Sequence, residues 1–162
     1  MWRSIKRRVE ALRVLIRPAG RSELEGVREL LKSRGLPHER FEKRLSHLFI
    51  AQSGGDLAGC VGLEDHGGIG LVRILAVHPD YEDEEIDRQL IEHIIDYARL
   101  SNMRELYAFA DALHPYLEEV GFKQIGPDQL PPQIRDLPDF DQLCPEGSVC
   151  LKLEIGRISS LE

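Results

Sequence analysis

The segment with the clearest chemical implication is a run of acids, with five carboxylates among residues 82–87. It follows the apolar, strand-like stretch Leu75-Ala76-Val77-His78-Pro79 and precedes a long pattern of helical period. A strand, a tight turn and a helix N-terminus together present backbone N–H groups and a positive dipole end to an anion. Glycines and a basic side chain usually assist such binding. The element order therefore predicts an anion-binding turn, whereas the side chains in it repel anions.

The three cysteines, Cys60, Cys144 and Cys150, are the other candidate reactive groups. A small, odd number is typical of buried, reduced thiols in a cytoplasmic protein rather than of a disulfide framework. Cys144 and Cys150 could pair or bind a metal, but no other Cys or His stands at ligand spacing beside them. We therefore expect no metal site and a cytoplasmic location.

Composition and charge limit the class of protein. The 162 residues, 42% of them hydrophobic, suffice for one domain with a sizeable core. No apolar run approaches the roughly 20 residues that span a bilayer, and the basic first residues lack the apolar core of a secretory signal. Residues 1–13 carry a net charge of +4, so the other 149 residues carry −11 of the total −7. We expect no nucleic-acid partner and no membrane span.

The hydrophobic pattern predicts alternating strands and helices. Strands are predicted at residues 14–18, 48–52, 57–63, 69–77, 105–109, 121–125 and 148–155. Helices are predicted between an N-cap at Ser22 and a stop at Gly35, and at residues 39–45, 83–100 and 111–119, with one turn at 133–136. Residues 71–109 should form a right-handed parallel strand–helix–strand unit.

The chain is expected to divide into a basic amphipathic helix at 1–13, one domain at 14–156 and a tail at 157–162. The helix at 1–13 could be a targeting or membrane-surface segment. We expect instead that its apolar face packs on the domain or on a second subunit.

The element order, with Leu-Ala-Val-His-Pro-Asp-Tyr at 75–81 entering the long helix, resembles the GNAT superfamily of acetyl-CoA-dependent N-acetyltransferases. The likeness extends over residues 14–155 and is strongest at 59–64, 119–122, 143–145 and 148–150. It is closest to the arsenic-resistance branch, which is itself close to N-acetylglutamate synthase domains. The resemblance implies an α/β fold: a mixed, mostly antiparallel sheet flanked by helices, with one parallel strand–helix–strand unit.

In that family the junction before the long helix reads Arg/Gln-x-x-Gly-x-Gly/Ala, and its backbone amides contact the pyrophosphate of CoA. On this chain the basic position is Glu82, the first glycine is Glu85 and the second is Asp87. Only Arg88 keeps a basic side chain near the junction. The preceding strand end would hold the pantetheine. The resemblance therefore gives as cofactor-binding candidates Leu75, Ala76, Val77, Glu82, Asp83, Glu85, Asp87 and Arg88.

The acids oppose CoA binding in three ways. Side chains block the close backbone approach that glycine allows. The missing cation removes a charge-assisted hydrogen bond of roughly 1.5–3 kcal/mol, and each carboxylate about 6 Å from a phosphate adds roughly 0.7–3 kcal/mol of repulsion. Acids in a helix's first turn are nevertheless favourable to the helix dipole by ~0.3–1 kcal/mol each. The run could be a lost site with a stabilised helix end, a docking site for a basic partner or a cation, or a CoA site that survives by another route.

The resemblance also implies a tyrosine general acid in a Phe-Tyr-x-x-x-Gly-Phe stretch. Counting back from Gly121 and Phe122, that tyrosine falls on Leu117. Tyr116 could replace it if the helix is turned, although packing in the core is the simpler role. His114 is a candidate base at the same end of the chain.

Two residues are candidates for the substrate side of the reaction. Arg73 stands where the resembling branch has an arginine, and its planar guanidinium could hold a substrate carboxylate. Glu64 could hold an amine or relay a proton through water. Either side chain could equally belong to a structural ion pair.

The sequence therefore predicts an inactive or strongly impaired GNAT relative that acts as a binding or oligomerisation module. A homodimer and a basic protein at the acidic run are its expected partners. The alternative is a working acetyl-CoA-dependent N-acetyltransferase acting on a small amine or amino acid. Acetyl-CoA is the expected cofactor if the protein is active, and none otherwise.

Overall fold

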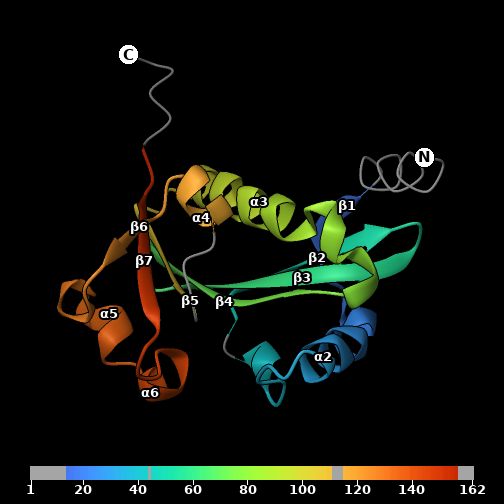
Figure 1. Ribbon diagram of the computed structural model, residues 1–162, viewed down its shortest axis with the longest axis horizontal. Helices are drawn as coiled ribbons and strands as arrows, with labels where there is room; N and C mark the ends of the chain where they lie inside the picture. The colour runs from blue at the N-terminus through green and yellow to red at the C-terminus, as the bar shows by residue number, and fades with distance from the viewer. Residues whose placement is uncertain (1–13, 44, 111–114, 157–162) are drawn as a thin grey trace. The chain divides into compact units, whose positions relative to one another are not determined.

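A computed structural model describes residues 14–43, 45–110 and 115–156. Seven strands form one mixed sheet in the order β1-β2-β3-β4-β5-β7-β6, in which β4 and β5 are parallel (Figure 1). The other pairings β1–β2, β2–β3, β5–β7 and β6–β7 are antiparallel. This confirms the predicted fold class. The strands are β1 Leu15–Pro18, β2 His47–Ser53, β3 Asp56–Asp65, β4 Ile69–Val77, β5 Glu105–Ala110, β6 Lys123–Ile125 and β7 Val149–Glu154.

The α-helices are α2 Leu24–Ser33, α3 Ile86–Leu100, α4 Pro115–Glu119, α5 Pro132–Arg135 and α6 Phe140–Leu143. Short 3₁₀ helices lie at Arg21–Glu23, Phe41–Lys43, Pro79–Glu84 and Pro127–Gln129. Among the described residues no helix is long and apolar enough to cross a membrane. The helix predicted at 1–13 and the tail at 157–162 lie outside the described residues.

The start of α2 differs from the prediction. Ser22 lies inside the preceding 3₁₀ turn, and α2 begins after Glu23. The turn is closed by Glu23, whose backbone N–H donates to Gly20 O and whose Oε1 accepts the Gly20 N–H at 2.7 Å. Arg17 also holds Glu23, with Nη1 2.7 Å from Oε1. The Glu23 carboxylate, with these two donors, therefore takes the capping role that was predicted for the Ser22 hydroxyl. The predicted stop at Gly35 is confirmed by its left-handed φ of 69°.

One further helix prediction is corrected, and one helical turn was not predicted. The piece predicted at 39–45 is a 3₁₀ turn at Phe41–Lys43, and Phe41 in it is buried. The turn predicted at 133–136 is followed by a second one, α6, which the periodicity did not indicate because it has only four residues.

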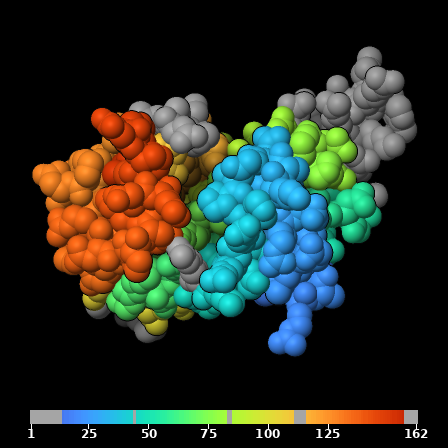
Figure 2. Space-filling model, turned by 90° about the horizontal axis from the view of Figure 1, so that it is seen from below, coloured from blue at the N-terminus to red at the C-terminus, as the bar shows by residue number. Residues whose placement is uncertain are grey.

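The chain forms two compact units. Unit 1 comprises the described residues up to Leu63 together with Arg73–Ile94. Figure 1 shows α2 and the first part of α3 on opposite faces of β2 and β3, and Figure 2 shows the face that α2 covers, in blue. The core beneath α2 consists of Val27, Leu30, Leu31, Phe41, Ile50, Cys60, Ile74 and Ala76.

Gly59 explains how closely α3 packs on β3. A Cβ at Gly59 would lie 2.9 Å from Ala76 O and 3.1 Å from Ile86 Cγ2 and Leu90 Cδ1. The missing side chain therefore lets the first turns of α3 lie directly on the strand. This close packing fixes the helix end that follows the acidic run.

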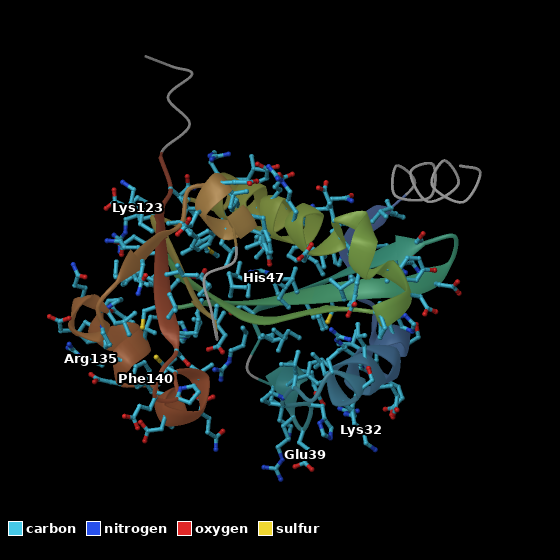
Figure 3. All side chains as sticks on the ribbon, in the orientation of Figure 1. Lys32, Glu39, His47, Lys123, Arg135 and Phe140 are labelled. Atoms are coloured by element: carbon cyan, nitrogen blue, oxygen red, sulfur yellow. The ribbon has the colours of Figure 1, made fainter. Side chains whose placement is uncertain are left out.

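Unit 2 comprises Glu64–Val72 and the described residues from Ile95 onward. Its parallel pairing joins residues 69–71 of β4 to residues 105–107 of β5. The short helices α5 and α6, marked by Arg135 and Phe140 in Figure 3, contribute to its core. The buried members of that core are Ile69, Leu71, Tyr107, Leu130, Ile134 and Cys150.

Candidate functional site

The acidic run of unit 1 begins in a well-defined turn rather than in the α-helix. His78 follows β4, its Nδ1 accepts the Asp80 N–H at 3.1 Å, and its carbonyl accepts the Tyr81 N–H at 2.9 Å. Residues Pro79–Glu84 then form a 3₁₀ helix, and α3 begins only at Ile86. The predicted helix start at residue 83 is therefore wrong. Only Asp87 of the run lies in the first turn of α3, so the favourable dipole interaction applies to that acid alone.

Glu85 connects the 3₁₀ helix to α3 with a left-handed backbone, at φ 55° and ψ 28°. This conformation costs an ordinary residue on the order of 1–2 kcal/mol and costs glycine almost nothing. Glu85 stands at the position where the family pattern has its first glycine. The turn thus has a conformation that favours glycine, although its residue is an exposed acid.

Glu82, at the position of the family's basic residue, is ion-paired. Its Oε1 lies 2.6 Å from Nη2 of Arg34, the residue that follows α2. The Arg34 and Glu82 side chains are 37% and 49% exposed. Sequence reasoning missed Arg34, because a contact between residues 48 positions apart leaves no local signal in the sequence.

Asp87 and Arg88, in the first turn of α3, also have partners. The Arg88 N–H donates to Asp87 Oδ1 at 2.9 Å, and Arg88 Nε donates to Glu92 Oε1 at 3.1 Å. Asp87 therefore occupies one amide of the first turn. The only basic side chain that the sequence retained in this region is partly neutralised by a residue one turn further along α3.

The other unit 1 candidates lie on β4, where successive side chains alternate between the two faces of the sheet. Ile74 and Ala76 enter the core beneath α2. Strand alternation places Arg73, Leu75 and Val77 on the opposite face, where all three are half-buried.

In unit 2, Glu64 is a buried carboxylate at the end of β3, only 5% exposed. Its Oε1 lies 2.9 Å from Nε2 of His66. The His66 N–H donates to Ile69 O at 2.8 Å, which fixes the histidine at the turn between β3 and β4. The His66 side chain is 24% exposed. A buried acid is therefore joined to a partly solvated imidazole, an arrangement that can transfer a proton. Sequence reasoning named Glu64 and missed His66.

Tyr116 lies half-buried on α4, whereas Leu117 beside it is buried. The Leu117 carbonyl accepts the Phe122 N–H at 2.9 Å, so the stretch closes as a compact helix end. The position that the family gives to tyrosine is thus a core leucine here. His114 lies outside the described residues.

A polar group that the sequence did not indicate joins β5 to β7. The Tyr107 hydroxyl donates to Glu105 Oε1 at 3.2 Å, and Lys152 Nζ lies 2.9 Å from Glu105 Oε2. Burial, followed by the charge of Glu105, raises the pKa of Tyr107. The hydrogen bond to Glu105 raises the pKa of Lys152. The charges of Glu105 and Lys152 neutralise each other across paired strands, and Tyr107 adds a hydrogen bond to Glu105. We therefore assign these three side chains a structural role.

The thiols of unit 2 lie close together, with Cys144 Sγ 3.6 Å from Cys150 Sγ, and both are free. Burial raises the pKa of Cys150 to about 12, and it does the same to Cys60 in unit 1. Over the described ranges no three His, Cys, Asp or Glu side chains are grouped to hold a metal ion.

Comparison with known proteins places these features in context. The model of the acetyltransferase (GNAT) domain matches residues 44–124, which is half of the chain. An amino-acid acetyltransferase of Neisseria meningitidis is 32% identical over 95 residues, covering 57% of this chain and 22% of the relative. The amino-acid acetyltransferase of Escherichia coli K12 is 26% identical over 136 residues, covering 78% and 31%. The chain thus spans between about a fifth and a third of the length of these relatives.

Solved structures agree with this result. N-acetylglutamate synthase from Neisseria gonorrhoeae, complexed with coenzyme A and N-acetyl-glutamate, has a TM-score of 0.75 and 27% identity. The match covers 89% of this chain and 35% of that one. A Mycobacterium tuberculosis protein solved with CoA also has a TM-score of 0.75, over 88% and 99% of the two chains. At 14% identity, this second structure supports the fold alone.

Proposed function

This chain belongs to the acetyltransferase (GNAT) domain family, and we propose that it is a working acetyl-CoA-dependent N-acetyltransferase whose acceptor is an amino acid or a small amine. The similar curated proteins are amino-acid acetyltransferases. A similar solved enzyme was complexed with coenzyme A and N-acetyl-glutamate. These relatives favour an active enzyme over the inactive binding module that the acidic run suggested.

The observation that carries the proposal is the conformation of the acidic turn. Glu85 adopts the left-handed backbone that a glycine would favour at this place, and Glu82 is paired with Arg34. The Glu82 charge is therefore partly neutralised, and the turn has a backbone suited to an anion. The ion pair weakens the electrostatic objection to CoA binding, and the backbone conformation supports the anion-binding role of the turn.

The proposed reaction is acyl transfer. The amine nitrogen attacks the thioester carbonyl, a C–N bond forms, the C–S bond breaks, CoA leaves as its thiol and the amine loses a proton. The backbone of Leu75–Val77 would hold the pantetheine, and the start of α3 would face the pyrophosphate. Arg73 would bind an acceptor carboxylate through its planar fork. The candidates for a proton acceptor and a proton donor, Glu64 and Tyr116, both belong to unit 2.

The test is calorimetric titration of acetyl-CoA into the whole chain, followed by an assay of acceptor-dependent CoA release with a panel of amino acids. The protein thiols should be blocked beforehand, so that only released CoA is detected. Micromolar binding with turnover of at least one carboxylate-bearing amine is expected. Binding without turnover of any acceptor would contradict the proposed enzyme.

A non-catalytic binding or oligomerisation module is the second candidate. It is favoured by the exposed carboxylate of Glu85 and by Asp87, which occupies an amide of the first turn of α3. Its partners would be a second copy or a basic protein, in the cytoplasm to which free thiols are suited. It predicts no binding at millimolar CoA, and recovery of binding in the triple variant Glu82→Arg, Glu85→Gly, Asp87→Gly.

A further inference from the structure

Arg34 contacts the turn before α3, although it lies 48 residues before Glu82 in the sequence of unit 1. Its Nη2 lies 2.6 Å from Glu82 Oε1, at the position where the family pattern has its own basic residue. We propose that Arg34 is a phosphate-binding residue, which keeps Nη2 on Glu82 and binds the pyrophosphate of CoA through the other N–H groups of its guanidinium. This inference rests on the proposed function. It means that the residue after α2, rather than the turn itself, supplies the missing cation.

The backbone at Arg34 is fixed, whereas its side chain is long and accessible. The Arg34 N–H donates to Leu30 O and Leu31 O, and the Leu36 N–H donates to Leu31 O at 2.9 Å. Gly35 ends the helix in the left-handed conformation. Figure 3 labels Lys32, which belongs to the last turn of α2, two residues before Arg34. The guanidinium therefore extends from a rigid position and can turn about its own side-chain bonds.

One guanidinium can serve both anions. Arginine carries five N–H donors, and the contact with Glu82 Oε1 is made by Nη2. A pyrophosphate offers two charged groups and a geometry that suits the planar guanidinium fork. Arg34 would therefore add contacts with the ligand while its charge still offsets that of Glu82.

The other basic residues nearby are held differently. Arg88 is paired with Glu92 along α3. Arg28 lies within α2, the helix that Arg34 follows, but it is paired with Glu25 and Glu42 and stacks on the ring of Phe41. Arg28 is therefore a matched control: it is an arginine of α2 whose ion-pair partners, Glu25 and Glu42, lie outside the turn before α3.

The test measures CoA affinity by calorimetry for the whole chain and the variants Arg34→Gln, Arg34→Lys and Arg28→Gln. We expect Arg34→Gln to weaken binding about ten- to hundredfold, the range for one charge-assisted contact. Arg34→Lys should lose part of this affinity, because an ammonium keeps the charge without the fork. Arg28→Gln should change affinity less than about twofold. Melting temperatures establish that each variant is folded.

A second ligand distinguishes the phosphates of CoA. The molecule 3′-dephospho-CoA keeps the pyrophosphate, so the loss caused by Arg34→Gln should be equal for both ligands. A loss seen with CoA but absent with 3′-dephospho-CoA would assign Arg34 to the 3′-phosphate and overturn the proposal. Tight binding by the natural chain that Arg34→Gln leaves unchanged would overturn this inference alone. Absence of any CoA binding by the natural chain would overturn the proposed function as well.

Discussion

Glu64 Oε1 lies 2.9 Å from His66 Nε2, which joins a carboxylate that is 5% exposed to an imidazole in contact with solvent. The two residues come from the end of β3 and the turn that follows, so the short chain between them fixes their distance. Glu64 is the candidate proton acceptor of the proposed reaction, and His66 would carry the proton outward.

Removal of the Glu64 carboxylate should therefore slow acetyl transfer and leave the affinity for CoA unchanged. We expect Glu64→Gln to lower kcat by about a hundredfold or more, the usual contribution of general base catalysis. His66→Gln should lower kcat by a smaller factor, because water can replace a relay. Steady-state kinetics measure both effects, and CoA affinity by calorimetry should be unchanged. A fall in CoA affinity equal to the fall in kcat would instead indicate disruption of the fold.

The left-handed residue Glu85 predicts a stabilising substitution. Glu85→Gly should raise the free energy of unfolding by about 1 kcal/mol, because glycine adopts this conformation without the Cβ penalty. Glu85→Ala removes the same charge but keeps the Cβ, so it serves as the control. Urea denaturation at neutral pH measures both variants. Equal stability of the two would show that charge, and not backbone conformation, dominates at this position.

Two glycines of unit 1 should respond to alanine in opposite directions. At Gly59 the new methyl group would meet Ala76 O at 2.9 Å, so the cost should be about 1–3 kcal/mol. Gly26 lies within α2, where a Cβ would meet Leu57 Cδ2 at an ordinary 3.5 Å. Alanine there should stabilise the protein by about 0.5–1 kcal/mol. Midpoints of thermal unfolding for Gly59→Ala and Gly26→Ala test the pair, and shifts of the same sign would contradict it.

The Arg17–Glu23 pair predicts sensitivity to acid. The hydrogen bond from Arg17, aided by the Gly20 N–H, lowers the pKa of Glu23 in the folded protein below its usual value near 4.5. The folded state thus binds a proton less readily than the unfolded chain does. The resulting stability is present above pH 4.5 and is lost as the pH falls through the lowered pKa.

Glu23→Gln should therefore reduce the melting temperature near neutral pH and make little difference at pH 2–3. Glu29→Gln, at an exposed position of α2, is the control. Melting curves recorded between pH 7 and pH 2 measure the effect. A constant difference across this range would assign the role of Glu23 to packing instead.

Much of the fold could be predicted from local patterns. Alternation and β-branched residues indicated the strands, and the helical period indicated the body of α3, because each pattern reflects one buried face. Helix starts were less predictable. Ser22 and the acids at 82–84 both resemble N-terminal helix residues, yet each lies in a 3₁₀ turn. Side-chain contacts and local closure decide such boundaries, and propensity does not record them.

In the candidate site, too, features of the local sequence could be predicted, whereas contacts that form only in the folded chain could not. Glu64 and the turn before α3 could be found from residue type and position. Arg34 could not, because its relation to Glu82 exists only after α2 has packed on the sheet. His66 lies two residues from Glu64, but nothing in the sequence shows that its ring turns back toward β3.

Glu85 has a wider consequence for how such turns are recognised. Its backbone is held in a glycine-like shape by the 3₁₀ helix before it and by α3 after it. The shape of the turn thus depends on its neighbours and tolerates a different residue at its centre. A motif search that demands glycine here will pass over chains of this kind, whereas a search by backbone torsion angles will retrieve them.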